Sequence, residues 1–150
     1  MELEKEIQQT KFKSERHKAV LNIVFTSSWI ACQQMRFFKD HDLSPQQYNV
    51  MRILRGQKGK PITVNGIQER MLDKNSNASR LIDKLKEKKL AERVICEKDR
   101  RQVDIIITNK GLELLKKIDM VIDDIENLYT TITEKEAEEL NRILDKLRNQ

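Results

Sequence analysis

Residues 73–81, Asp-Lys-Asn-Ser-Asn-Ala-Ser-Arg-Leu, combine short polar side chains with the start of a helical apolar pattern. Asn75 is suited to cap a helix of about 14 residues. The residues expected to face its core recur at helical spacing: Leu81, Ile82 and Leu85. A shorter helix, capped by Thr63 and ending near Met71, comes directly before it. Two short helices joined by a tight turn predict a helix-turn-helix.

Two strand-like segments follow this pair of helices, Ala91 to Cys96 and Gln102 to Thr108. Between them lies the charged stretch 97–101, Glu-Lys-Asp-Arg-Arg, which we interpret as a hairpin tip. In the second segment the apolar residues alternate onto one face: Val103, Ile105 and Ile107. A hairpin behind a helix-turn-helix is a wing. The predicted fold class is therefore mostly α with a small β-wing, a winged helix-turn-helix.

Longer helices are predicted on both sides of this unit. One runs from about Lys11 to Lys39. The next begins at Ser44-Pro45-Gln46-Gln47, which supplies a capping box and a proline at the first helical position. It stops at Gly56, a residue that tolerates a left-handed cap. Pro61 to Thr63 is expected to be a short extended segment.

The C-terminal part is expected to hold two further helices. The first is capped by Thr108, and its apolar stripe is formed by Leu112, Leu115, Ile118, Ile122, Ile125 and Leu128. The second begins at the capping box of Thr133 and Glu136. It carries a narrow apolar seam suited to a partner helix: Ala137, Leu140, Leu144 and Leu147.

The length of 150 residues suits one domain, which we divide by function. We expect residues 43–111 to form the winged helix-turn-helix lobe, as the DNA-binding part, and residues 1–42 and 112–150 to supply the N- and C-terminal dimerisation helices. The net charge is +5, and residues 74–101 are the densest positive region, with ten basic and five acidic side chains. This charge distribution suits a protein with one face on a polyanion.

Several classes of protein are disfavoured by the sequence. The uncharged segment between Ala19 and Met35 is too polar to span a membrane, and no signal peptide is visible, so we expect a cytoplasmic protein without membrane contact. Cys32 and Cys96 form no metal-ligand or disulfide pattern. With four glycines and two histidines and no phosphate loop or catalytic set, we expect neither an enzyme nor a cofactor.

Three stretches of the chain resemble the MarR family of bacterial transcription regulators. They are residues 43–48, Leu-Ser-Pro-Gln-Gln-Tyr; residues 73–81; and Asp99-Arg100-Arg101 with Thr108-Asn109-Lys110-Gly111 behind it. The resemblance implies a homodimer that binds double-stranded DNA at a near-palindromic operator. It also implies repression as the usual mode and, for many members, release by a small phenolic or lipophilic effector.

The candidate DNA-reading residues lie at the start of the second helix of the pair. Short polar side chains there can approach base edges in the major groove, with basic ones behind them. Arg80 could take a guanine edge or hold a phosphate, and Asn77 could pair with adenine. The full set is Asn75, Ser76, Asn77, Ser79, Arg80 and Lys84. Thr63 and Lys74 are candidates for contact with the DNA backbone.

The second candidate surface is the wing. By the family resemblance Arg101 would enter the minor groove, with Asp99 bracing its guanidinium. Arg100 and Lys98 would hold phosphates. The alternative interpretation is a solvated turn with a local charge pair.

A candidate effector pocket comprises Trp29, Phe37, Tyr48 and Met51, although burial in the core is the more common role for such residues. Cys32 would make a redox-responsive regulator only if it were a reactive thiol, and a structural cysteine is the commoner case. An activator of the same fold and a protein-interaction module without specific DNA binding remain the alternatives. The chain departs from the family pattern at Lys89, where a glycine is usual, and at Gly66, where a helix-favouring residue is usual.

Overall fold

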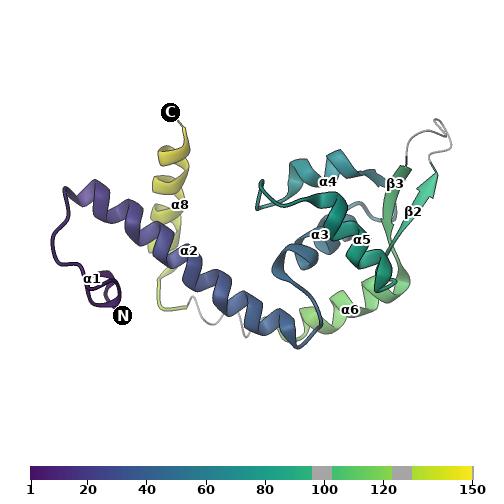
Figure 1. Cartoon of the computed structure of the whole chain (residues 1–150), viewed down its shortest axis with the longest axis horizontal. Helices are drawn as coiled ribbons and strands as arrows, with labels where there is room; N and C mark the ends of the chain where they lie inside the picture. The colour runs from purple at the N-terminus through teal and green to yellow at the C-terminus, as the bar shows by residue number, and fades with distance from the viewer. Residues whose placement is uncertain (96–102, 123–129, 150) are drawn as a thin grey trace. The chain divides into compact units, whose positions relative to one another are not determined.

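The computed structural model describes residues 1–95, 103–122 and 130–149 (Figure 1). The chain divides into two compact units, Met1–Leu115 and Lys116–Gln150. The predicted class, mostly α with a small β-sheet, is confirmed. The elements are α1 Leu3–Glu6, α2 Glu15–Lys39, α3 Pro45–Gly56, β1 Ile62–Thr63, α4 Val64–Arg70, α5 Ala78–Glu87, β2 Ala91–Ile95, β3 Val103–Ile107, α6 Asn109–Asp119 and α8 Glu134–Arg148.

Helix α5, the second helix of the helix-turn-helix, begins later than predicted. Its N-cap is Asn77, whose side-chain oxygen accepts from the Arg80 amide at 3.0 Å, so the prediction that Asn75 is the cap was wrong. The helix has 10 residues. The physical reason is the carboxylate of Asp73, which accepts from the Asn75 amide at 3.0 Å and holds that residue in the turn.

The C-terminal end of α5 turns through Lys89, which has a φ of 61°. The Leu90 amide donates to the Leu85 carbonyl and the Lys89 amide to the Lys86 carbonyl, at 2.9 and 2.8 Å. These two bonds form a Schellman motif in which lysine occupies the position that usually holds glycine. Lys89, the residue that departs from the usual glycine, therefore adopts the left-handed turn itself.

The segment between β3 and α6 supplies partners for the carbonyl groups exposed at this helix end. The Thr108 hydroxyl donates to the Lys89 carbonyl at 2.8 Å, and its amide donates to the Leu90 carbonyl at 3.1 Å. The Lys110 ammonium donates to the Lys88 carbonyl at 2.9 Å. Carbonyls at a helix C-terminus have no partner within the helix, so this segment ties the end of α5 to α6.

Gly111 is required by close packing at the same junction. A Cβ on Gly111 would lie 2.4 Å from the Leu90 carbonyl oxygen and 2.8 Å from an Ile107 side-chain carbon. Its amide donates to the Thr108 hydroxyl oxygen at 3.1 Å, which confirms Thr108 as the cap of α6. The segment Thr108-Asn109-Lys110-Gly111 thus connects β3 to α6 and packs closely against the C-terminal end of α5.

The sheet has three strands in the order β1-β3-β2, all antiparallel. Ile62 of β1 pairs with Ile105 of β3, and Ala91 of β2 pairs with Ile107. The alternation predicted for β3 is confirmed at Ile105 and Ile107, which are both buried. It fails at the first residue of the strand, Val103, which is 42% exposed. The short extended segment predicted before α4 is strand β1, which lies at one edge of the sheet. Figure 1 shows β2 and β3 beside α5.

Local capping determines where most other helices begin. The capping boxes predicted at Ser44 and Thr133 and the cap at Thr63 are all present. The hydrogen bonds from Thr133 hold the pKa of the Glu136 carboxyl below its usual value. Helix α2 begins at Glu15 instead of Lys11, because the Ser14 hydroxyl oxygen accepts from the amide of residue 17.

Two other helix ends, those of α3 and α6, differ in part from the prediction. Helix α3 ends at Gly56 as predicted, but the left-handed residues that follow are Lys58 and Gly59, with φ of 53° and 82°, and Gly56 itself is helical. Helix α6 ends at Asp119, and residues 120–122 form a turn. The remainder of the predicted stripe falls partly outside the described residues.

The core of the first unit lies between α3, α4, α5 and the sheet. Each contributes fully or almost fully buried side chains, namely Val50, Met51, Leu54, Ile67, Met71, Ile82, Leu85 and Ile105. Burying one such side chain contributes roughly 1.5–3 kcal/mol. Gly66 has a packing role here, because an added Cβ would lie 2.9 Å from an Ile62 side-chain carbon.

We predict that Gly111→Ala destabilises the protein by about 1–3 kcal/mol, because the new methyl group meets backbone and must displace it. Gly56→Ala is the matched control. No atom lies within 4 Å of a Cβ placed there, and alanine favours a helix, so stability should hold or rise. Urea unfolding followed by circular dichroism measures both. Equal stability of the two variants would contradict the packing role of Gly111.

Candidate nucleic-acid interface

The N-terminal half of α5 and the loop before it present a continuous polar surface. Asn75, Asn77, Ser79, Arg80 and Lys84 are exposed, and Ser76 is partly buried. The opposite face of the helix is apolar and buried through Ala78, Ile82 and Leu85. The same amphipathic pattern that attaches α5 to the core therefore exposes the predicted reading residues on one side.

The loop that carries these residues is held by side-chain hydrogen bonds. One Asp73 carboxylate oxygen accepts from the Asn75 amide, and the other accepts from the Ser76 hydroxyl at 2.9 Å. At the start of the loop the Leu72 amide donates to the side-chain oxygen of Asn49 in α3, at 3.0 Å. The loop is thus braced both by itself and by a neighbouring helix.

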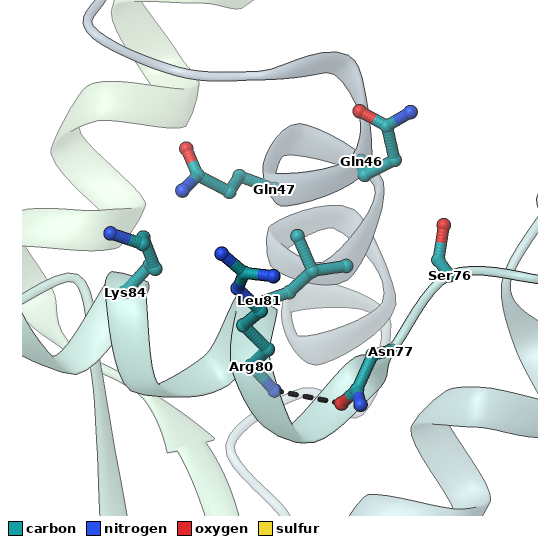
Figure 2. A pocket seen from close by; sticks show the side chains of 7 residues that line it. All are labelled: Gln46, Gln47, Ser76, Asn77, Arg80, Leu81 and Lys84. Atoms are coloured by element: carbon teal, nitrogen blue, oxygen red, sulfur yellow. Dashed lines mark hydrogen bonds between the residues drawn. The ribbon is translucent and has the colours of Figure 1, made fainter.

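The hydrogen bond at Asn77 limits how this residue could contact a base. Its Oδ1 accepts from the Arg80 amide as the helix cap (Figure 2). Bidentate pairing with adenine needs an acceptor and a donor from the same amide group. The predicted adenine contact would therefore use an oxygen that already closes the helix, and the structure assigns Asn77 a capping role.

Arg80 and Lys84 border a shallow hollow of about 300 Å³ beside α5. Leu81 of α5, Ser76 and Asn77 of the loop, and Gln46 and Gln47 from the first turn of α3 complete its lining (Figure 2). The two glutamines were predicted only as part of a helix start, and their position next to the reading helix was not predicted. Nothing local in the sequence indicates that proximity, because it results from the packing of α3 on α5.

An ion pair connects α5 to the wing strand β2. The Arg93 guanidinium donates to the Asp83 carboxylate at 2.9 Å, and both side chains are about half exposed. This pair was also not predicted. The predicted wing contacts Lys98, Asp99, Arg100 and Arg101 lie outside the described residues, as does Cys96.

Both candidates for DNA-backbone contact already take part in the fold. The Thr63 hydroxyl oxygen accepts from the Gly66 amide at 2.9 Å as the cap of α4. Lys74 is exposed, and its ammonium donates to the Glu69 carbonyl. Thr63 therefore lies at the N-terminal end of α4, and the Lys74 ammonium lies near its C-terminal end.

The four candidate effector residues lie in different environments. Met51 is fully buried in the core. Phe37 and Tyr48 are partly buried and both contact the ring of Phe38, with centroid distances of 5.1 and 4.4 Å. Trp29 is partly buried on α2. A second hollow of about 430 Å³ is lined by other residues, including Met35, Lys39, Leu43 and Lys88.

Lys88 is one of the residues that line the second hollow. Its ammonium lies 3.0 Å from a carboxylate oxygen of Asp42 and also donates to the Asp42 carbonyl. Asp42 has a φ of 52° and stands in the connection between α2 and α3. The end of α5 is thus tied to this connection.

The part of the chain that the structure describes contains no group of three or more histidine, cysteine, aspartate or glutamate side chains placed to hold a metal ion. None of its helices combines the length and apolarity that crossing a membrane requires. Cys32 is a free, partly buried thiol.

Comparison with known proteins identifies this arrangement. Residues 41–102 match the family model described as MarR family. A curated relative is PecS, an HTH-type transcriptional regulator of Dickeya dadantii (strain 3937). It is 25% identical over 117 residues, an alignment that covers 75% of this chain and 69% of PecS.

Solved structures agree with this match. A MarR transcription factor from Planctomyces limnophilus has 28% identity and a TM-score of 0.69 over 90% of this chain and 98% of that one. The S. aureus MepR–DNA complex has 21% identity and a TM-score of 0.74 over 91% and 97%. The organohalide-sensing regulator RdhR-CbdbA1625 in its 2,4-dichlorophenol-bound form has 19% and 0.81 over 94% and 86%. This chain is therefore similar to the MarR family of winged helix-turn-helix transcription regulators, with the family match in residues 41–102 and the fold shared over most of the chain.

Proposed function

We propose that this regulator binds a near-palindromic DNA operator as a homodimer and represses transcription from it. Residues 43–111 form the DNA-binding lobe, and residues 1–42 and 112–150 supply the dimerisation helices. Helix α5 enters the major groove, and the wing lies along the neighbouring minor groove. Among the solved structures with this fold, MepR is described in complex with DNA, which supports the assignment.

The observation that carries the proposal is the exposed polar start of α5 on a rigid support. Arg80 projects from the first turns of a helix whose opposite face is fixed in the core. A guanidinium in that position can make a bidentate contact with guanine or hold a phosphate, and Lys84 lies one turn behind it. At the wing, Arg101 would occupy the minor groove, where the negative potential is strongest over narrow A·T-rich stretches.

We predict that Arg80→Ala weakens binding to the selected operator by about 5- to 150-fold, as expected for the loss of a contact worth about 1–3 kcal/mol. The operator is first selected from a randomised DNA pool, and affinities are measured by fluorescence anisotropy at two salt concentrations. Arg148→Ala is the matched control, since it removes the same charge from an exposed residue of α8 and should leave affinity unchanged. Equal losses of DNA affinity in both variants would mean that Arg80 contributes only through the net charge of the protein.

The alternative of a protein-interaction module makes a different prediction in the same assay. Such a module would select no DNA sequence, and Arg101→Ala would have no effect on DNA affinity. Enrichment of half-sites about one DNA turn, roughly 34 Å, apart would support a dimeric regulator. Whether the bound protein represses or activates is read from the position of the operator relative to the promoter.

Dimerisation is supported by the apolar surfaces of α2 and α8. None of the fifteen residues of α8, all of them described, is buried, although the helix is amphipathic. In the 25 residues of α2 only Phe38 is buried. Large apolar side chains on these helices that remain exposed are Val20, Ile23, Val24, Met35, Leu140, Ile143 and Leu147. An uncovered surface of this kind is typical of an interface, and we propose a second copy of the chain as its partner.

We predict that the protein sediments at twice the chain mass of 17.8 kDa and that Ile143→Glu shifts it toward the monomer. A carboxylate in the centre of an apolar interface would lose its solvation without a partner. Glu138→Gln changes the charge of the same helix at an exposed polar position and should not alter the mass. A stable 17.8 kDa species at micromolar concentration of the unaltered protein would refute dimerisation.

We also propose that a small lipophilic or phenolic molecule releases the regulator from DNA. A structural neighbour with this fold is described with 2,4-dichlorophenol bound, which supports this chemistry. A ligand acts in this way only if it binds the DNA-incompetent conformation more tightly than the DNA-bound one. The side chains proposed to take part are Trp29, Phe37, Tyr48 and Met51.

We expect titration with 2,4-dichlorophenol or salicylate to lower operator affinity and to change the fluorescence of Trp29. Trp29 is the single tryptophan of the chain and therefore reports on this region alone. Benzyl alcohol, which lacks an acidic group, serves as the comparison ligand. Unchanged fluorescence together with unchanged DNA affinity at millimolar ligand would exclude this class of effector.

A further inference from the structure

Gln68, in the middle of α4, makes two hydrogen bonds that span the loop before the reading helix. Its Nε2 donates to the Lys74 carbonyl at 3.2 Å, and its Oε1 accepts from the Ala78 amide at 3.1 Å. One side-chain amide therefore holds the backbone immediately before and immediately after residues 75–77. The loop between these two points carries three of the proposed reading residues.

The bond to Ala78 also satisfies a group that the helix cannot satisfy by itself. Ala78 is the first residue of α5, and the amides of a first helical turn have no acceptor within the helix. The Asn77 side chain accepts from the Arg80 amide, so a second acceptor is needed at Ala78. Gln68 supplies this acceptor from a different helix, and it thereby ties the first turn of α5 to α4.

The remaining hydrogen bonds of the loop do not replace this brace. Those of Asp73 are internal to the loop, reaching Asn75 and Ser76, and they shape it without fixing its position. Asn49 contacts only the start of the loop, at Leu72. Gln68 is the side chain that joins both ends of residues 75–77 to the helix packed behind them, among the hydrogen bonds of the described segment 72–78.

We propose that Gln68 is a positioning residue for DNA reading: it holds the Asn75–Asn77 loop and the first turn of α5 in the geometry that selects the operator. This inference rests on the proposed function. Gln68 acts through the loop backbone and is not assigned any contact with DNA. Its removal should therefore reduce discrimination between sequences more than it reduces binding to DNA in general, because phosphate contacts tolerate a displaced loop better than base contacts do.

The test compares three variants with the unaltered full-length protein. Gln68→Met keeps the length and helix propensity of the side chain and removes both hydrogen bonds. Gln68→Glu keeps the acceptor for the Ala78 amide and removes the donor to the Lys74 carbonyl. Ile67→Val, at a fully buried neighbour on the same helix, lowers stability without touching the loop and is the matched control.

The readouts are the ratio of affinities for the selected operator and for scrambled DNA, and the hydrogen-exchange rate of the Ala78 amide. We expect Gln68→Met to lower the ratio about tenfold and to speed exchange at Ala78, with scrambled-DNA affinity unchanged. Gln68→Glu should retain protection at Ala78 and lose part of the ratio. Ile67→Val should keep the ratio of the unaltered protein.

Two failures can be told apart in this design. If the unaltered protein binds all DNA sequences equally, the proposed function is wrong. If the unaltered protein is selective and Gln68→Met is equally selective, the positioning role is overturned and the proposed function stands. A ratio that falls equally in Gln68→Met and Ile67→Val would also overturn the positioning role, because general destabilisation would then explain it.

Discussion

The architecture of the DNA-binding lobe depends on the carbonyl groups at the end of α5. Lys88, Lys89 and Leu90 expose three successive carbonyls there, and the segment Thr108–Lys110 supplies a donor to each. The strands that enclose the wing lie between these two segments in sequence. Satisfying the helix end therefore also closes the β2–β3 hairpin and sets the start of α6. Gly111 permits the necessary approach, since any side chain there would meet the Leu90 carbonyl oxygen.

The other end of α5 is held by an equivalent use of unsatisfied backbone groups. The amides of the first turn are taken up by Asn77 and by Gln68 of the preceding helix. A helix fixed at both termini and buried along one face has little freedom to tilt, and only its polar face remains for recognition. This explains why polar residues near the reading surface divide into two roles. Asp73 and Asn77 make hydrogen bonds that hold the loop and the helix start, whereas the exposed side chains of Arg80 and Lys84 project from α5.

The helices outside the lobe follow a different principle. Helices α2 and α8 each begin at a side-chain cap and carry exposed apolar side chains, yet almost none of their residues is buried within the chain. Their local sequence is sufficient to define a helix but not to define what covers it. In the proposed dimer a second copy covers them, and the separation of the two reading heads then depends on helices that take no part in base recognition. Such an arrangement links DNA affinity to anything that changes how the copies pack.

Helix starts controlled by a nearby side chain were determined by the sequence itself: Ser44, Thr63 and Thr133 cap the helices predicted for them. These caps connect residues three positions apart, so a short stretch contains all the information. The winged helix-turn-helix class followed from the same local patterns. Tertiary structure alone decided the pairing of β1 with β3 and the placing of Gln46 and Gln47 beside the reading helix. Each of these depends on groups that are distant in sequence and meet only when the core forms, which no local pattern can specify.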